Sequence, residues 1–173
     1  MTELDSRCLE AFPQWLRSLG DDARALALVV EADDTPEPTR RAVAAALSYL
    51  FRSLDLIPDG IEDLGLIDDA FVFRVSAARA GGGSDALGRL AGEVALIREF
   101  LGDDHQRLEA YVEGLSKGAA RGRSVDEIVA DAGVRSDFAH EVRTWADGYR
   151  APSFQRDPKT LVKLKSFLLT KLP

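Results

Sequence analysis

Two apolar segments at helical spacing, separated by an acidic connection that contains a proline, constrain the fold of this chain more than any other feature. Apolar residues recur at steps of three and four within Ala42–Phe51 and again within Ala70–Ala78, which is the spacing of one helix face. Pro58 pushes the residue before it out of the helical region, so the first helix has to end near Ser53. The stretch Arg41–Ala80 therefore predicts a helical hairpin.

The ends of these two helices can be predicted from their capping residues. Thr35 is expected to begin the first helix, because its hydroxyl can cap a first turn that carries Pro36 and Pro38. Asp68 or Asp69 is expected to cap the second helix, where a carboxylate meets unpaired N–H groups and the positive end of the helix dipole.

The connection between the helices carries six acidic side chains and no basic one, and Ca²⁺ and Mg²⁺ prefer such oxygen ligands. Counted from Asp55 as position 1 of an EF-hand loop, Asp59, Gly60 and Asp63 fall at positions 5, 6 and 9. Leu66 stands at position 12, where an EF-hand needs a bidentate carboxylate. The candidate ligands of a Ca²⁺ or Mg²⁺ site are Asp55, Asp59, Asp63, Asp68 and Asp69.

The same carboxylates have two other interpretations. In one, Asp55, Asp68 and Asp69 cap helix ends and accept hydrogen bonds from turn amides, while Glu62 and Asp63 are solvated. In the other, a pair of carboxylates serves as general acid and base. Because no nucleophile or phosphate-gripping loop accompanies the cluster, the sequence favours a non-enzymatic role and assigns no catalytic residue.

The rest of the chain continues the helical pattern. Gly20 is expected to end a short helix and Asp21 to cap the next one. After the glycines that follow Ala80, Ser84 is expected to cap a helix that reaches Leu101. Further helices are expected at about 108–115, 124–132, 138–145 and 159–171. Ser124 and Glu127 have the capping-box spacing at the start of the second of these four.

No β-pattern, internal repeat or low-complexity tract interrupts these helices. With 173 residues, of which 46% are hydrophobic, the chain has the size of one domain. We therefore predict an all-α fold in which residues 1–173 form a single-domain helical bundle of about seven or eight helices, with the hairpin at its centre.

Charge and cysteine content restrict the partners and the compartment. A net charge of −7 argues against nucleic acid as a partner, because that affinity comes chiefly from Lys and Arg. Cys8 has no second cysteine to pair with, and the start of the chain is not basic, so we expect a cytoplasmic protein. The lysine-rich segment Lys159–Lys171 could contact an anionic membrane surface or a protein partner, including a second copy of this acidic chain.

The residues of the connection also resemble a known bacterial family. Asp55-Leu56-Ile57-Pro58-Asp59, followed by Gly65 and Asp68-Asp69, is similar to the signature of the YkvA-like family, the domain of unknown function 1232. In that signature a helix ends in Ser-Pro-Ile-Asp-Leu-Ile-Pro-Asp and an apolar turn follows. Here Arg52-Ser53 replaces the Ser-Pro, and Glu62 and Asp63 interrupt the apolar turn.

The resemblance covers residues 41–80 and implies membrane association through the apolar turn, an implication that Glu62 and Asp63 weaken. Together with the acidic composition, it leads us to expect a YkvA-like, non-enzymatic interaction or adaptor module. The alternatives are a divalent-cation-binding protein that uses the connection, and a peripheral membrane protein.

Overall fold

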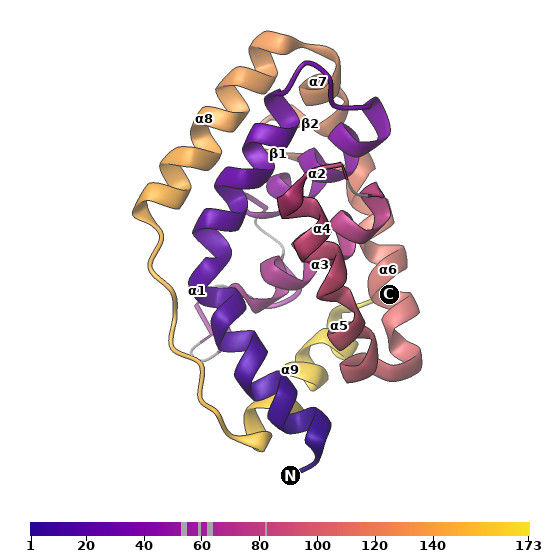
Figure 1. Ribbon diagram of the computed structural model, residues 1–173, viewed down its shortest axis with the longest axis vertical. Coiled ribbons are helices and arrows are strands. Elements are labelled where there is room, and N and C mark those ends of the chain that lie inside the picture. The colour runs from indigo at the N-terminus through magenta and orange to yellow at the C-terminus, as the bar shows by residue number, and fades with distance from the viewer. Residues whose placement is uncertain (53–54, 59, 62–63, 82) are drawn as a thin grey trace.

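The structure, a computed structural model, describes residues 1–52, 55–58, 60–61, 64–81 and 83–173. Helices account for most of these residues, and the predicted all-α bundle is confirmed (Figure 1). The longer helices are α1 (Glu3–Glu31), α2 (Glu37–Tyr49), α3 (Ile67–Ala80), α4 (Asp85–Gly92), α5 (Val94–Leu101), α6 (His105–Gly114), α7 (Val125–Ala130), α8 (Ala132–Gly148) and α9 (Pro158–Lys171). Short elements complete the chain, namely the 3-10 turns η1 (Gly102–Asp104) and η2 (Leu115–Lys117) and the strands β1 (Ala119–Ala120) and β2 (Arg123–Ser124).

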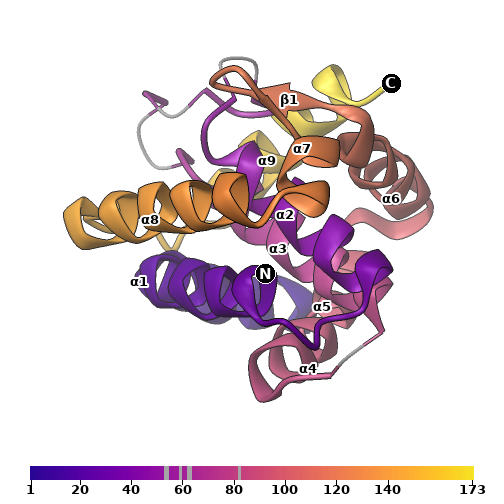
Figure 2. The same cartoon turned by 90° about the horizontal axis from the view of Figure 1, so that it is seen from above.

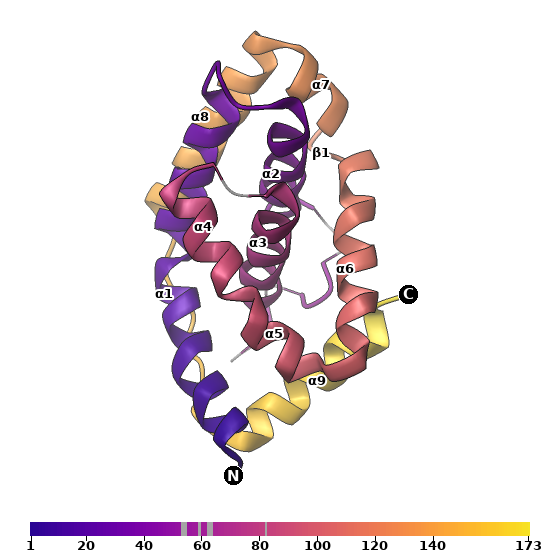
Figure 3. The same cartoon turned by 45° about the vertical axis from the view of Figure 1, so that its right-hand side comes forward.

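The predicted hairpin forms the centre of the molecule. Its helices α2 and α3 pack on each other, with α4 and α5 over one side of α3 and α6 along another (Figure 3). The long helices α1 and α8 lie side by side and cover a further face of the hairpin (Figure 2). Helix α9 crosses the end of the bundle near the start of α1, and its leucines Leu161, Leu164 and Leu168 are buried.

Helix α2 is shorter than predicted at both ends, and α3 begins earlier than predicted. The Thr35 hydroxyl donates to the Val29 carbonyl at 2.6 Å, so α2 begins at Glu37 with Pro36 before it. Helix α2 ends at Tyr49 and not near Ser53, which lies outside the described residues. Helix α3 follows Leu66, whose φ of 70° sets the entry into the helix without a side-chain cap.

The prediction that Asp68 or Asp69 caps α3 is therefore wrong. Because the left-handed turn at Leu66 starts the helix at Ile67, both aspartates lie inside its first turn. Their negative charge still suits that end of the helix dipole. Both side chains are fully buried, which turns them toward the core and away from the solvent-exposed position of a usual cap.

Gly20 does not end a helix, and α1 runs without interruption from Glu3 to Glu31. A Cβ at this position would lie 3.2 Å from the Tyr149 ring and 3.5 Å from the Ala146 carbonyl oxygen. The glycine therefore serves the close approach of α8, and burial of side chains such as Phe12 and Leu16 holds the helix together across it.

Other helix boundaries combine confirmed caps with local corrections. The Ser84 hydroxyl accepts from the Leu87 amide at 3.2 Å, and Ser124 forms a capping box with Glu127, both as predicted. The helix expected from Ser84 to Leu101 is divided at Glu93 into α4 and α5. The loop before Ser124 contains the small antiparallel pair β1–β2, which the sequence did not indicate.

Candidate functional site

Three carboxylates from the two ends of the acidic connection meet where α2 and α3 are joined. Asp55 follows α2, while Asp68 and Asp69 belong to the first turn of α3. One oxygen from each of the three side chains lies within 4.8 Å of the other two. Asp68 and Asp69 are fully buried and Asp55 is half-buried, so the cluster, here called the aspartate triad, lies at the edge of the core.

Tyr49 fixes the position of Asp68. Its phenol donates to Asp68 Oδ2 at 2.6 Å and accepts from the Leu56 amide at 2.7 Å. The Ile57 amide also points to Asp68 Oδ2, at 3.3 Å. The last residue of α2, the connection and the first turn of α3 are thereby held in one buried network. Asp68 thus accepts from a turn amide, as one of the sequence-based interpretations proposed.

The surrounding tyrosines report the electrostatics of the triad. Burial, followed by the charge of Asp68, raises the pKa of Tyr49 above its ordinary value. Burial, followed by the charge of Asp69, raises the pKa of Tyr149, whose hydroxyl donates to the Leu16 carbonyl at 2.6 Å. Burial also raises the pKa of Tyr111, which packs edge-on against Tyr49. All three phenols are protonated at neutral pH.

The structure brings together three of the five residues predicted as metal ligands. Asp55, Asp68 and Asp69 converge, and Asp59 and Asp63 lie outside the described residues. Two members of the triad therefore come from beyond the twelve-residue window of an EF-hand that starts at Asp55. The convergence joins both ends of the connection and does not depend on the order of ligands along one loop.

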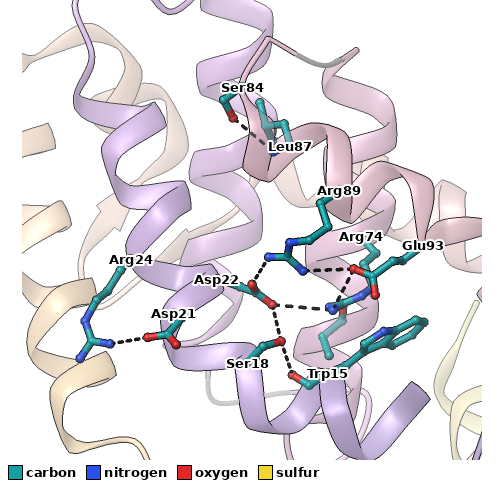
Figure 4. Close-up of polar contacts among 11 residues, drawn as sticks. Trp15, Ser18, Asp21, Asp22, Arg24, Arg74, Ser84, Leu87, Arg89 and Glu93 are labelled. Carbon is teal, nitrogen blue, oxygen red and sulfur yellow. Dashed lines mark hydrogen bonds and ion pairs between the residues drawn. The ribbon is translucent and has the colours of Figure 1, made fainter. Parts of the chain in front are cut away.

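A second buried group of charges lies about Arg74 of α3 (Figure 4). Arg74 Nη2 lies 3.7 Å from Asp22 Oδ2 and 3.6 Å from Glu93 Oε1. Its Nη1 donates to the Ala70 carbonyl at 3.0 Å, and its guanidinium lies 4.1 Å from the centre of the Trp15 ring. The side chains of Arg74 and Asp22 are almost completely buried.

Asp22 is the centre of this group. It accepts from the Ser18 hydroxyl at 2.9 Å and from the guanidinium of Arg89, which also reaches Glu93 at 3.2 Å. Burial lowers the pKa of Arg74 to about 10, against the opposing effect of the charges on Glu93 and Asp22. At neutral pH the core therefore contains a charged guanidinium between two acidic partners.

Sequence reasoning missed this group, although a signal for it exists. Arg74 interrupts the otherwise apolar run from Ala70 to Val75, and Asp22 precedes a strongly apolar stretch of α1. Charged residues are almost never fully buried unless they are paired. One acidic and one basic residue in two strongly apolar helices thus indicate a buried pair.

Among the described residues, no helix combines the length and the apolar composition needed to cross a bilayer.

Comparison with known proteins identifies the central hairpin. No curated protein and no solved structure matches the chain. Residues 39–74 match the family described as "Protein of unknown function (DUF1232)". The match extends from α2 through the connection to Arg74 and so includes Tyr49 and the whole aspartate triad. The narrower YkvA-like name is compatible with this match, and the central hairpin of the protein is a DUF1232 segment.

Proposed function

We propose that the aspartate triad binds a divalent cation, and that the protein is a non-enzymatic binding module whose central hairpin is stabilised by that cation. The observation that carries the proposal is the convergence of one oxygen each from Asp55, Asp68 and Asp69 within 4.8 Å, with two of the three side chains fully buried.

Electrostatics supports a cation at this place. Like charges at such short distances disfavour each other's ionised form, and burial adds a desolvation cost. A divalent cation offsets both effects, because it attracts all three carboxylates and replaces part of their lost hydration. Carboxylate oxygens are also the ligands that Ca²⁺, Mg²⁺ and Mn²⁺ prefer.

The spacing of the triad is compatible with a divalent cation such as Ca²⁺. Two oxygens bound to the same ion cannot be farther apart than twice the metal–oxygen distance, which is roughly 5 Å for Ca²⁺ and roughly 4.2 Å for Mg²⁺. The limit of 4.8 Å on the triad lies within the range for Ca²⁺.

A bound cation would act on the hairpin as a whole. Asp68 is already linked to the end of α2 by Tyr49 and to the connection by the Ile57 amide. An ion shared by Asp55 and the first turn of α3 would add a further link between the same segments. The expected consequence is a protein whose stability depends on the cation.

Thermal unfolding of chelator-treated protein with added Ca²⁺, Mg²⁺ or Mn²⁺ tests the proposal. A ligand that binds only the folded state stabilises it by about 2.7 kcal/mol at a concentration a hundred times its Kd, so the midpoint should rise. The matched variants are Asp55→Asn, which removes the half-buried ligand, and Asp104→Asn, which changes a half-buried aspartate of η1 outside the triad.

The shift should disappear in Asp55→Asn and persist in Asp104→Asn. A wild-type midpoint that none of the three ions changes, or a shift that survives in Asp55→Asn, would contradict the proposal. A cytoplasmic location, self-association, a protein partner and membrane contact through α9 stay predictions.

A further inference from the structure

A pocket of about 280 Å³ lies between α2, α3 and α6, away from the aspartate triad. Polar and apolar side chains line it in comparable numbers: Pro38, Arg41, Ala42, Ala45, Ser76, Arg79, Val112, Glu113 and Ser116. Two of these residues are arginines from different helices of the hairpin, Arg41 of α2 and Arg79 of α3.

The floor of the pocket is made of small side chains. Ala42 and Ala45 come from α2, and Ser76 comes from the facing side of α3. Ser76 is only 3% exposed, and it lines the pocket. A buried hydroxyl gains from a hydrogen-bond partner, and the pocket is the space in which a ligand could supply one.

Arg79 lines the same pocket, and its side chain is 40% exposed. Its Nη2 lies 3.5 Å from Glu113 Oε1, which is an ion pair but is too long for a good hydrogen bond. No other partner of this guanidinium is found among the described residues. The Glu113 side chain is 67% exposed, so an incoming anion could displace it.

Arg41 supplies the second guanidinium from α2. Its Nη2 donates to Glu37 at 3.2 Å and its Nη1 contacts Asp126, and both carboxylates are largely exposed. The neighbouring Arg40 differs, because its donors go to the Val30 and Ala32 carbonyls at the end of α1. Arg41 can therefore exchange its partners, whereas Arg40 serves the fold.

We propose that this pocket binds a small phosphate or phosphate monoester. Guanidinium groups bind oxyanions through paired, charge-assisted hydrogen bonds. The tetrahedral phosphate offers oxygens to Arg41 and Arg79 and a further acceptor to the Ser76 hydroxyl on the floor. Glu113 occupies the position of a competing anion, and the remaining volume admits a small organic group.

Direct binding of inorganic phosphate, followed by calorimetry and by phosphorus NMR at constant ionic strength, tests this proposal. Thermal shifts are unsuitable because phosphate salts stabilise proteins in general. Arg79→Gln should weaken binding at least about tenfold, since it removes charge-assisted hydrogen bonds, and Arg79→Lys should weaken it less. Glu113→Gln should strengthen binding several-fold by removing the competing carboxylate.

The matched controls are Arg98→Gln and Glu109→Gln. Arg98 Nε contacts Glu109 at 2.9 Å, and Glu109 lies one turn before Glu113 on α6. These controls remove a similar ion pair outside the pocket and should leave phosphate binding unchanged. If Arg98→Gln weakens binding as much as Arg79→Gln does, or Glu109→Gln strengthens it as much as Glu113→Gln does, the effect is one of net charge and the proposal fails.

Two further outcomes would overturn the site, namely the absence of saturable phosphate binding to the wild-type protein, and a Glu113→Gln variant that binds no more tightly than wild type. A second titration with glycerol 3-phosphate distinguishes a phosphate monoester from inorganic phosphate as the ligand. Tighter binding than that of inorganic phosphate would assign the pocket to a monoester, and equal or weaker binding would assign it to the free ion.

Discussion

Asp22 and Arg74 place opposite charges in the core, where each compensates the other. Replacing Asp22 with Ala should therefore destabilise the protein by about 3 kcal/mol, because breaking a buried pair leaves an uncompensated charge. The distance of 3.7 Å between Asp22 Oδ2 and Arg74 Nη2, together with the help of Glu93, puts this expectation at the lower end of the usual range. Urea unfolding at neutral pH measures the change.

The adjacent Asp21 provides the control for this prediction. It pairs with Arg24 at the surface, where its side chain is 84% exposed, so Asp21→Ala should change stability very little. The double variant Asp22→Leu with Arg74→Met should lose less stability than the two single changes together, because both charges leave the core at once. Equal losses of stability for Asp21→Ala and Asp22→Ala would contradict this prediction, because the buried pair would then contribute no more to the free energy of unfolding than the surface pair.

The individual residues of both buried groups could be predicted from the sequence only in part. The acidic run identified Asp55, Asp68 and Asp69 as candidate ligands, because its composition is unusual. The role of Tyr49 could not be predicted, since an aromatic residue at a helical spacing has the same pattern whether it packs or donates a hydrogen bond. Arg74 and Asp22 are far apart in sequence, so only the packing of α1 on α3 brings them together.

The contact between α1 and α8 depends on Gly20. Gly20→Val should destabilise the protein by about 1–3 kcal/mol, because the added atoms would overlap the Tyr149 ring and the Ala146 carbonyl. The hydrogen bond of 2.6 Å from the Tyr149 hydroxyl to the Leu16 carbonyl would be strained by the same displacement. Denaturant unfolding measures the loss of stability.

Gly88 is the matched position for this change. It also lies inside a helix, α4, but a Cβ there meets no atom within 4 Å. Gly88→Val should be close to neutral, because valine is somewhat better than glycine in a helix. If Gly20→Val were equally neutral, α8 would have to move away from α1 without cost, and the close approach would not be a requirement of the fold.

At the level of helices, local signals succeeded where a side chain alone decides the boundary. Ser84 and Ser124 cap their helices because the serine hydroxyl satisfies a nearby amide whatever the rest of the protein does. Gly20 and Asp68 were misinterpreted because tertiary contacts use the same residue types for other purposes. Thr35 was misinterpreted because its hydroxyl donates to the Val29 carbonyl near the end of α1. The helical hairpin itself was predictable, since apolar periodicity and Pro58 fix it locally.

For the whole molecule, periodicity predicts an all-α bundle but not the arrangement of its helices. Every amphipathic helix can bury its apolar face against several neighbours, and the choice depends on details such as the glycine between α1 and α8. The consequences of burial for ionisation also belong to this scale. All three tyrosines of the chain, and the buried Cys8, have a pKa that burial raises, that of Cys8 to about 12.

Alkaline pH should therefore unfold the protein cooperatively. The unfolded-state pKa values are about 8.5 for Cys and 10 for Tyr. Below them these four groups are protonated in the folded and in the unfolded protein, and their contribution to stability is fully present. Above those values only the unfolded chain releases the protons, so each group can lower the free energy of unfolding by about 1.4 kcal/mol per pH unit. Arg74 offsets the effect of one of these groups. Its folded-state pKa is lowered to about 10, so above that pH the unfolded chain holds one proton more than the folded protein at this residue.

Tyrosinate absorbance, followed together with helical circular dichroism, should rise only as the helices are lost. Tyr111→Phe should make the stability depend less steeply on pH. Gradual tyrosinate formation near pH 10 in a protein that keeps its helices would contradict this prediction.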